Sequence, residues 1–71
     1  MSKINIGDYF LHKEKYKIFT IKEQIDMGVR KGILYVIYYP KTNEYGRYYE
    51  WKILEKGIKV EGNKLAELLA T

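Results

Sequence analysis

Residues 33–53, with the sequence ILYVIYYP-KTNEYG-RYYEWKI, decide the fold of this chain. Two runs rich in β-branched and aromatic residues, Ile33–Pro40 and Arg47–Ile53, flank a turn-rich segment, Lys41–Gly46. Two such runs around a short turn predict a β-hairpin. Because this hairpin carries most of the apolar side chains that a chain of 71 residues can offer to a core, it predicts a mainly β domain.

The two runs are expected to pair with Tyr39 opposite Arg47 across the loop. Side chains alternate between the two faces of a strand, so this register assigns every hairpin residue to a face. The charges of Glu50 and Lys52 indicate that their face is the outer one. The opposite face then supplies the predicted core, which comprises Tyr35, Ile37, Tyr49, Trp51 and Ile53.

Three further strands are predicted around the hairpin. They are Gly7–His12, Tyr16–Lys22 with a continuation to Ile25 left open, and Ile58–Val60. In the second of them Ile18 falls on the opposite face from Phe19 and Ile21, and a β-bulge at this point would resolve the conflict. The two glycines of Gly28–Gly32 indicate the turn that leads into the hairpin, and Pro40 is expected to end its first strand.

The C-terminal segment predicts a helix. Leu65, Leu68 and Leu69 have the i, i+3, i+4 spacing of one helical face, and Asn63 is a suitable N-cap. A helix of about two turns is unstable alone, so its leucines are expected to dock on the sheet. Together the elements predict a single domain over residues 1–71 without a linker, mainly all-β, as a small five-stranded SH3-like barrel with a short C-terminal helix.

Composition and charge narrow the functional classes. The chain has no cysteine, so neither disulfides nor thiolate metal sites are available. Its longest apolar run, Ile33–Pro40, is far shorter than the roughly 20 residues of a membrane helix, and residues 1–8 lack the apolar region of a secretory signal. A cytoplasmic location is therefore expected. The formal net charge of +4 permits binding to nucleic acid or to an acidic protein, and is also typical of a lysine-rich surface.

The outer face of the hairpin is the predicted protein-binding surface. It would carry Leu34, Val36, Tyr38 and Tyr48, with Tyr38 opposite Tyr48. Aromatic and aliphatic side chains of this kind form the hot spots of protein interfaces. Two alternatives stay open: cross-strand packing that only stabilises the hairpin, and cover of the pair by the C-terminal leucines.

Nucleic-acid binding is the alternative function. In a meander alternate loops lie at the same end, so Lys13, Lys15 and Lys41 would meet near Arg47 and Tyr45, which offer phosphate contacts and a stacking ring. Arg30, Lys31 and Lys56 would lie at the other end. Because the positive charges are divided between two ends, protein-protein contact is the preferred hypothesis.

Catalytic chemistry lacks its usual residues. Ser2 is the only serine and His12 the only histidine, so the chain cannot supply a Ser-His triad or a cluster of histidines and cysteines around a metal. No glycine spacing matches a phosphate-binding or dinucleotide-binding loop. The sequence predicts a non-enzymatic binding module with no catalytic residue, no metal ligand, no cofactor, no membrane contact and no small-molecule substrate.

Two resemblances add to this prediction. Ile6–Phe10 resembles the first strand of many SH3-like modules, including KOW and Tudor domains, where a Gly-Asp pair precedes an apolar strand. Over its full length, and in the segment Tyr45–Trp51, the chain resembles YorP-like small prophage-encoded proteins of Bacillus. The second resemblance implies an SH3-like barrel from a temperate phage, acting by binding host or phage macromolecules. It implies no particular functional residue.

Overall fold

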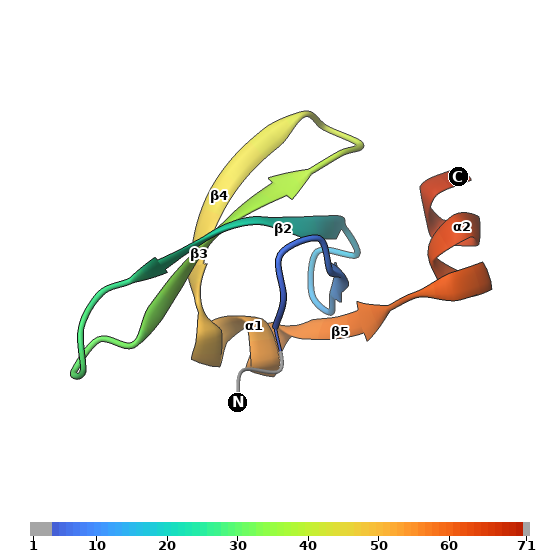
Figure 1. Cartoon of the computed structure of the whole chain (residues 1–71). Helices are drawn as coiled ribbons and strands as arrows, with labels where there is room; N and C mark the ends of the chain where they lie inside the picture. Colours follow the sequence, from blue (N-terminus) through green and yellow to red (C-terminus); the bar gives the residue numbers. More distant parts are fainter. Residues whose placement is uncertain (1–3, 71) are drawn as a thin grey trace.

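The computed structural model describes residues 4–70 and consists of one antiparallel sheet with two short helices (Figure 1). Along the chain the elements are β1 (Tyr9–His12), β2 (Ile18–Asp26), β3 (Ile33–Tyr39), β4 (Glu44–Tyr49), α1 (Glu50–Lys56), β5 (Gly57–Val60) and α2 (Gly62–Ala70). The predicted mainly β class, the five strands and the C-terminal helix are confirmed. The helix α1 was not predicted.

The five strands form a meander in which the last strand returns to the first. The order across the sheet is β4-β3-β2-β1-β5, and every neighbouring pair is antiparallel. Within the described part of the chain β4 and β5 do not pair with each other, so strand pairing does not close the sheet into a barrel. The strands β4 and β5 are therefore the two edges of the sheet.

The β3–β4 hairpin is present, but its predicted register is wrong. Tyr39 lies opposite Glu44 instead of Arg47, a shift of three residues. The loop is shorter than predicted because Pro40 ends β3 and Asn43 adopts a left-handed conformation with φ of 57°, which lets β4 begin at Glu44. Because the shift is odd, it exchanges the two faces of the second strand.

The predicted second strand also ends early, because Glu50–Lys56 forms the helix α1. Glu50 lies in the first turn of α1 and Lys56 in the last, which suits the helix dipole at both ends. The alternation of charged residues with Trp51 and Ile53 therefore does not mark two faces of a strand. It reflects one turn of a helix that buries Ile53 and leaves Trp51 62% exposed.

The core lies on the inner face of the sheet and under α1. Its main cluster contains Ile4, Phe10, Phe19, Ile21, Tyr35, Ile37, Tyr39 and Ile53. Of the predicted core residues, Tyr35 and Ile37 are confirmed, and Ile53 is buried from the helix instead of from a strand. The prediction for Tyr49 is wrong because the register shift places Tyr48 on the inner face in its stead, and the prediction for Trp51 is wrong because Trp51 lies exposed on α1.

The bulge in β2 lies further along the strand than predicted. It falls between Ile21 and Glu23, so Lys22 is the extra residue, and the strand then continues to Asp26. The run from Ile18 to Ile21 is buried throughout, which removes the conflict that the bulge was expected to resolve. The β2–β3 turn contains Gly28 and Gly32 at positive φ, as predicted.

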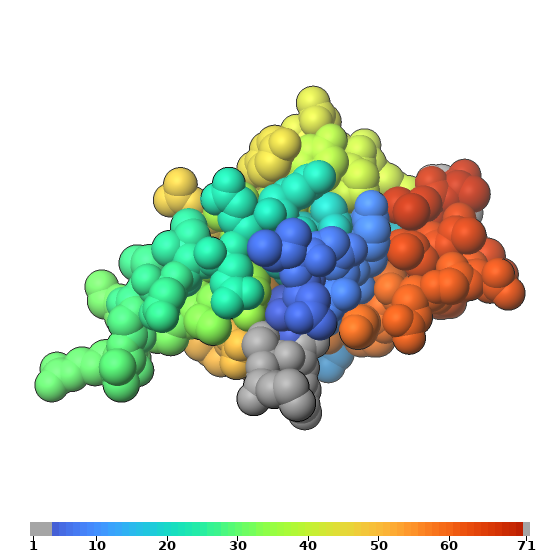
Figure 2. All heavy atoms as spheres, viewed as in Figure 1, coloured from blue at the N-terminus to red at the C-terminus, as the bar shows by residue number. Residues whose placement is uncertain are grey.

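The C-terminal helix α2 does not dock as predicted. It begins at Gly62, which places Asn63 inside the helix instead of at the N-cap, and within Gly62–Ala70 no residue is buried. Leu65 and Leu68 are half-buried, and Leu69 is 41% exposed. In Figure 1 α2 stands beyond the end of β5, and in Figure 2 it forms a lobe on the opposite side of the molecule from the β2–β3 turn.

No helix within residues 4–70 is long and apolar enough to cross a membrane.

Candidate functional site

The structure divides the predicted binding residues between two surfaces. The first, here called the hairpin face, is the outer face of the β3–β4 hairpin and consists of Leu34, Val36, Tyr38, Tyr45, Arg47 and Tyr49, which are cross-strand partners. Three of the four predicted protein-binding residues, Leu34, Val36 and Tyr38, belong to it. The fourth, Tyr48, does not, because the register shift turns its side chain to the inner face.

The loop end of the hairpin face carries a pair of tyrosine rings. Tyr38 and Tyr45 lie directly opposite each other with ring centroids 4.8 Å apart and ring planes at 44°. The Tyr38 hydroxyl donates a hydrogen bond of 2.7 Å to Asn43 Oδ1, and Lys22 Nζ lies 5.4 Å from the Tyr38 ring centroid. Tyr38 is half-buried by these contacts, whereas Tyr45 is 68% exposed. The predicted Tyr38–Tyr48 pair is thus replaced by Tyr38–Tyr45.

Beside the tyrosine pair the surface is hollowed. The hollow is lined by Glu23 of β2, Val36 of β3, and Tyr45, Gly46 and Arg47 of β4. Gly46 lies opposite Ile37, and a Cβ atom on it would point to the inner face, 3.5 and 3.6 Å from side-chain atoms of Ile37, so Gly46 lines the hollow with backbone alone beside the half-buried Val36. The hollow therefore offers an apolar floor with an aromatic ring, a cation and a carboxylate at its rim.

The second surface, here called the basic end, is formed by the β1–β2 loop, the β3–β4 loop and one side of α1. Its cations are Lys13, Lys15, Lys17, Lys41, Lys52 and Lys56. The predicted meeting of Lys13, Lys15 and Lys41 is consistent with the Lys17–Glu44 ion pair of 3.6 Å that joins the two loops. Tyr45 and Arg47, predicted for the same site, lie instead on the hairpin face.

One prediction about charge is wrong at this end. Lys56 was expected beside Arg30 and Lys31, but α1 carries the chain back across the molecule, and the Lys13 amide donates to the Lys56 carbonyl at 2.8 Å. The carboxylates at the basic end are Glu14, Glu44 and Glu55. Six lysines against three glutamates leave an excess of three positive charges, in a chain whose formal net charge is +4. The positive charge is concentrated here, and not divided evenly between two ends.

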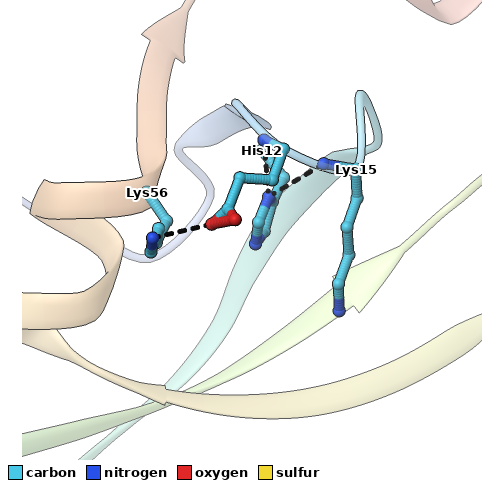
Figure 3. A network of polar contacts seen from close by, with 4 residues as sticks. His12, Lys15 and Lys56 are labelled. Atoms are coloured by element: carbon cyan, nitrogen blue, oxygen red, sulfur yellow. Dashed lines mark hydrogen bonds and ion pairs between the residues drawn. The ribbon is translucent and has the colours of Figure 1, made fainter.

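An ion pair and an aromatic ring contact two lysines of the basic end, and Figure 3 shows the ion pair at Lys56. Lys56 Nζ contacts Glu14 Oε1 at 2.7 Å, and this contact lowers the pKa of Glu14 and raises that of Lys56. Lys52 Nζ lies 5.7 Å from the centroid of the Tyr48 ring. Hydrogen bonding to Thr42 and the charge of Lys17 lower the pKa of Glu44.

His12 supports the loop beneath these lysines. It is only 3% exposed, and its Nδ1 accepts hydrogen bonds of 3.2 Å from the backbone amides of Glu14 and Lys15. An Nδ1 that accepts two amide protons carries no proton itself, which favours the neutral ring. Burial, together with the charge of Lys15, lowers the pKa of His12 below its ordinary value. His12 is therefore a structural residue of the β1–β2 loop.

Tyr48 joins the core to the basic end. Its hydroxyl lies 2.6 Å from the hydroxyl of Tyr39, and its ring lies edge-on to Phe19 at 5.7 Å and 6.1 Å from the ring of His12. Burial and the hydrogen bond to Tyr48 raise the pKa of Tyr39, so the Tyr39 phenol is neutral in the physiological range. Tyr48 is a packing residue, and no longer a member of the protein-binding surface.

Two exposed aromatic residues were missed by the sequence analysis. Tyr16, in the β1–β2 loop, is 81% exposed and adopts a left-handed conformation with φ of 52°. Trp51 is exposed on α1 and lines a hollow with Lys31, Gly32, Ile33 and Glu50. The sequence analysis assigned Tyr16 to a strand and Trp51 to the core. The exposure of Trp51 could have been predicted only if the helix α1 had been predicted.

The described residues do not form a metal-binding cluster. Between Ile4 and Ala70 no group of three or more His, Cys, Asp or Glu side chains is placed to hold a metal ion. Ser2, the only serine, lies outside this range. Comparisons of the chain with protein-family models, with curated proteins and with solved structures find no match.

Proposed function

We propose that this chain is a non-enzymatic binding module of the SH3-like type whose hairpin face contacts a protein partner. The SH3-like assignment is supported by the five-stranded antiparallel meander and by the pairing of β5 with β1, which joins the two ends of the meander. Following the resemblance of the sequence, the chain would be an accessory protein of a Bacillus prophage in the bacterial cytoplasm.

The observation that carries the protein-binding proposal is the exposed Tyr38–Tyr45 pair beside the hollow at Arg47. Tyrosine and arginine are enriched among the residues that dominate binding energy in protein interfaces. Tyr45 is 68% exposed, and no residue of α2 (Gly62–Ala70) is buried. Cover by the C-terminal leucines, the alternative considered for this surface, therefore does not remove Tyr45 from solvent.

The side chains of the hairpin face are held in place before a partner binds. Its side chains project from two paired strands, and Tyr38 is held by its hydrogen bond to Asn43. Anchors that are fixed before binding lose less conformational entropy when a complex forms. The hollow fits an apolar side chain of the partner, and Arg47 with Lys22 fits a partner carboxylate, so we expect a partner segment that combines apolar and acidic residues.

The experiment compares capture of proteins from Bacillus lysate by the tagged wild type and by the double variant Tyr38→Ala/Tyr45→Ala. Loss of two anchor rings is expected to weaken binding by about 30-fold or more, the effect of one strong hot spot. The matched control, Ile6→Ala/Ile58→Ala, removes two exposed apolar side chains elsewhere and should bind like the wild type. Thermal unfolding of all three proteins shows whether each variant is folded.

A folded Tyr38→Ala/Tyr45→Ala variant that keeps the partner of the wild type would refute the proposal. Equal loss in the Ile6→Ala/Ile58→Ala control would also refute it, because binding would then depend on exposed apolar area in general. The alternative function, binding of nucleic acid, rests on a different surface and on different residues.

A further inference from the structure

A hollow of about 180 Å³ lies between the β1–β2 and β3–β4 loops at the basic end. It is lined by Tyr16, Lys17, Ile18, Tyr39, Lys41 and Thr42. Ile18 and Tyr39 are buried, at 4% and 8% exposure, so they form an apolar and aromatic floor. The exposed residues Tyr16, Lys17, Lys41 and Thr42 form the rim.

Tyr16 holds its ring at this rim in an unusual backbone conformation. A φ of 52° is uncommon for a residue other than glycine, asparagine or aspartate, and its amide is fixed by donating to the His12 carbonyl at 2.8 Å. The ring is 81% exposed, so burial of the side chain does not compensate for this conformation. Residues held in such conformations concentrate at ligand-binding sites.

The charge around the hollow selects the kind of ligand. Lys15 and Lys17 flank Tyr16 in the sequence, Lys41 lies on the facing loop, and the basic end carries an excess of three positive charges. The Lys17–Glu44 contact of 3.6 Å joins two side chains that are 44% and 60% exposed, so it is weak and can exchange for an anionic ligand. Lysines around an exposed aromatic ring suit a ligand with both phosphates and flat rings.

We propose that the basic end binds single-stranded nucleic acid, with one base in the hollow against Tyr16 and the backbone phosphates on Lys15, Lys17 and Lys41. A peptide with acidic side chains alone would pair with the lysines but would leave the aromatic wall and floor without a matching group. In a duplex the bases are stacked and cannot enter a hollow between two loops, which favours a single strand. This inference does not depend on the hairpin face.

The experiment measures fluorescence anisotropy of a labelled oligothymidylate of about eight nucleotides, a length within the range that such surfaces cover. Three phosphate contacts predict that raising the salt concentration from about 50 to about 200 mM weakens binding roughly 20-fold. The variant Tyr16→Gly removes the stacking ring and suits the left-handed conformation, so it should remain folded and bind about tenfold more weakly.

The role of the positive charges at the basic end is tested with two triple variants that have the same net charge. Lys15→Glu/Lys17→Glu/Lys41→Glu should abolish binding, whereas Arg30→Glu/Lys31→Glu/Lys64→Glu, which changes exposed cations elsewhere, should retain most of it. The hairpin-face variant Tyr38→Ala/Tyr45→Ala should bind the oligonucleotide like the wild type. Failure of this proposal can therefore be told apart from failure of the protein-binding proposal.

Three results would overturn the inference. The first is wild-type affinity in a folded Tyr16→Gly variant, and the second is equal loss in both triple variants, which would indicate attraction by net charge alone. The third is equally tight binding of inorganic polyphosphate or of a duplex, since either would show that no base enters the hollow.

Discussion

At the scale of single residues, His12 links the stability of the fold to pH. Its neutral Nδ1 accepts the amides of Glu14 and Lys15, and the charges that face its ring come from Lys15, Glu14, Lys52 and Lys56. Burial and the neighbouring lysines lower its pKa in the folded protein below the ordinary value of 6.5. Protonation therefore favours the unfolded chain, in which the ring takes up a proton more readily.

We expect the free energy of unfolding to be highest above about pH 6.5 and to fall as the pH decreases through the folded-state pKa of His12. Glu14 and Glu44, whose pKa values are lowered below 4.5, titrate below the pH range of the measurement. The measurement is urea unfolding of the wild type between about pH 5 and about pH 7.5. The control His12→Asn places an uncharged acceptor near Nδ1 and should show little pH dependence; equal slopes in both proteins would contradict the assignment.

At the scale of elements, α1 is the feature that most changes the interpretation of the sequence. It converts the predicted end of a strand into a helix that buries Ile53, exposes Trp51 and carries Lys56 to the basic end. Where α1 meets β5, a Cβ atom on Gly57 would lie 2.9 Å from the Ile53 carbonyl oxygen, so this close approach of backbone requires glycine. The helix thus determines both the core and the distribution of charge.

Paired substitutions distinguish the helix from the predicted strand. Ile53→Ala removes a fully buried side chain and should lower the free energy of unfolding by about 2–5 kcal/mol. Trp51→Ala removes a side chain that is 62% exposed and should cost about 0.5 kcal/mol or less. Chemical denaturation of both variants provides the measurement. A cost of about 3–5 kcal/mol for Trp51→Ala would instead indicate a core tryptophan, as in the strand prediction.

Local signals in the sequence were sufficient for most elements. Pro40 and the glycines of Gly28–Gly32 mark real chain reversals, and the leucine spacing marks a real helix. The register of the hairpin was not predictable in the same way, because it depends on whether the loop begins its second strand at Glu44 or later. α1 was missed because charged residues alternate with Trp51 and Ile53 there, a pattern that a single helical turn shares with a strand.

The same distinction between local signals and strand pairing explains which parts of the candidate site could be predicted from the sequence. Leu34, Val36 and Tyr38 share a face because side chains alternate within one strand, which holds for any register. The place of Tyr48 depended on the pairing with the next strand, and an odd shift moved it to the inner face. Tyr16 was not predicted because its role depends on the meeting of two loops that are distant in sequence.

At the scale of the whole molecule, the two surfaces are distinct in composition and in position. The hairpin face combines tyrosines and aliphatic residues with Arg47 on the outer side of β3 and β4, whereas the basic end gathers six lysines around two loops and α1. Since no residue is common to both sets, variants of one surface should leave the other functional.

The central claim, that the hairpin face contacts a protein partner, is tested most directly by photo-crosslinking in cells of the Bacillus host that the resemblance of the sequence implies. A photoreactive phenylalanine analogue would replace Tyr45, which is 68% exposed at the loop end of the face, and in a second protein Ile58, which is 49% exposed on β5. The account predicts one dominant crosslinked protein from position 45, lost when Tyr38→Ala is added, and none of that mass from position 58. A crosslink of equal yield to the same protein from position 58, or none from position 45, would contradict it.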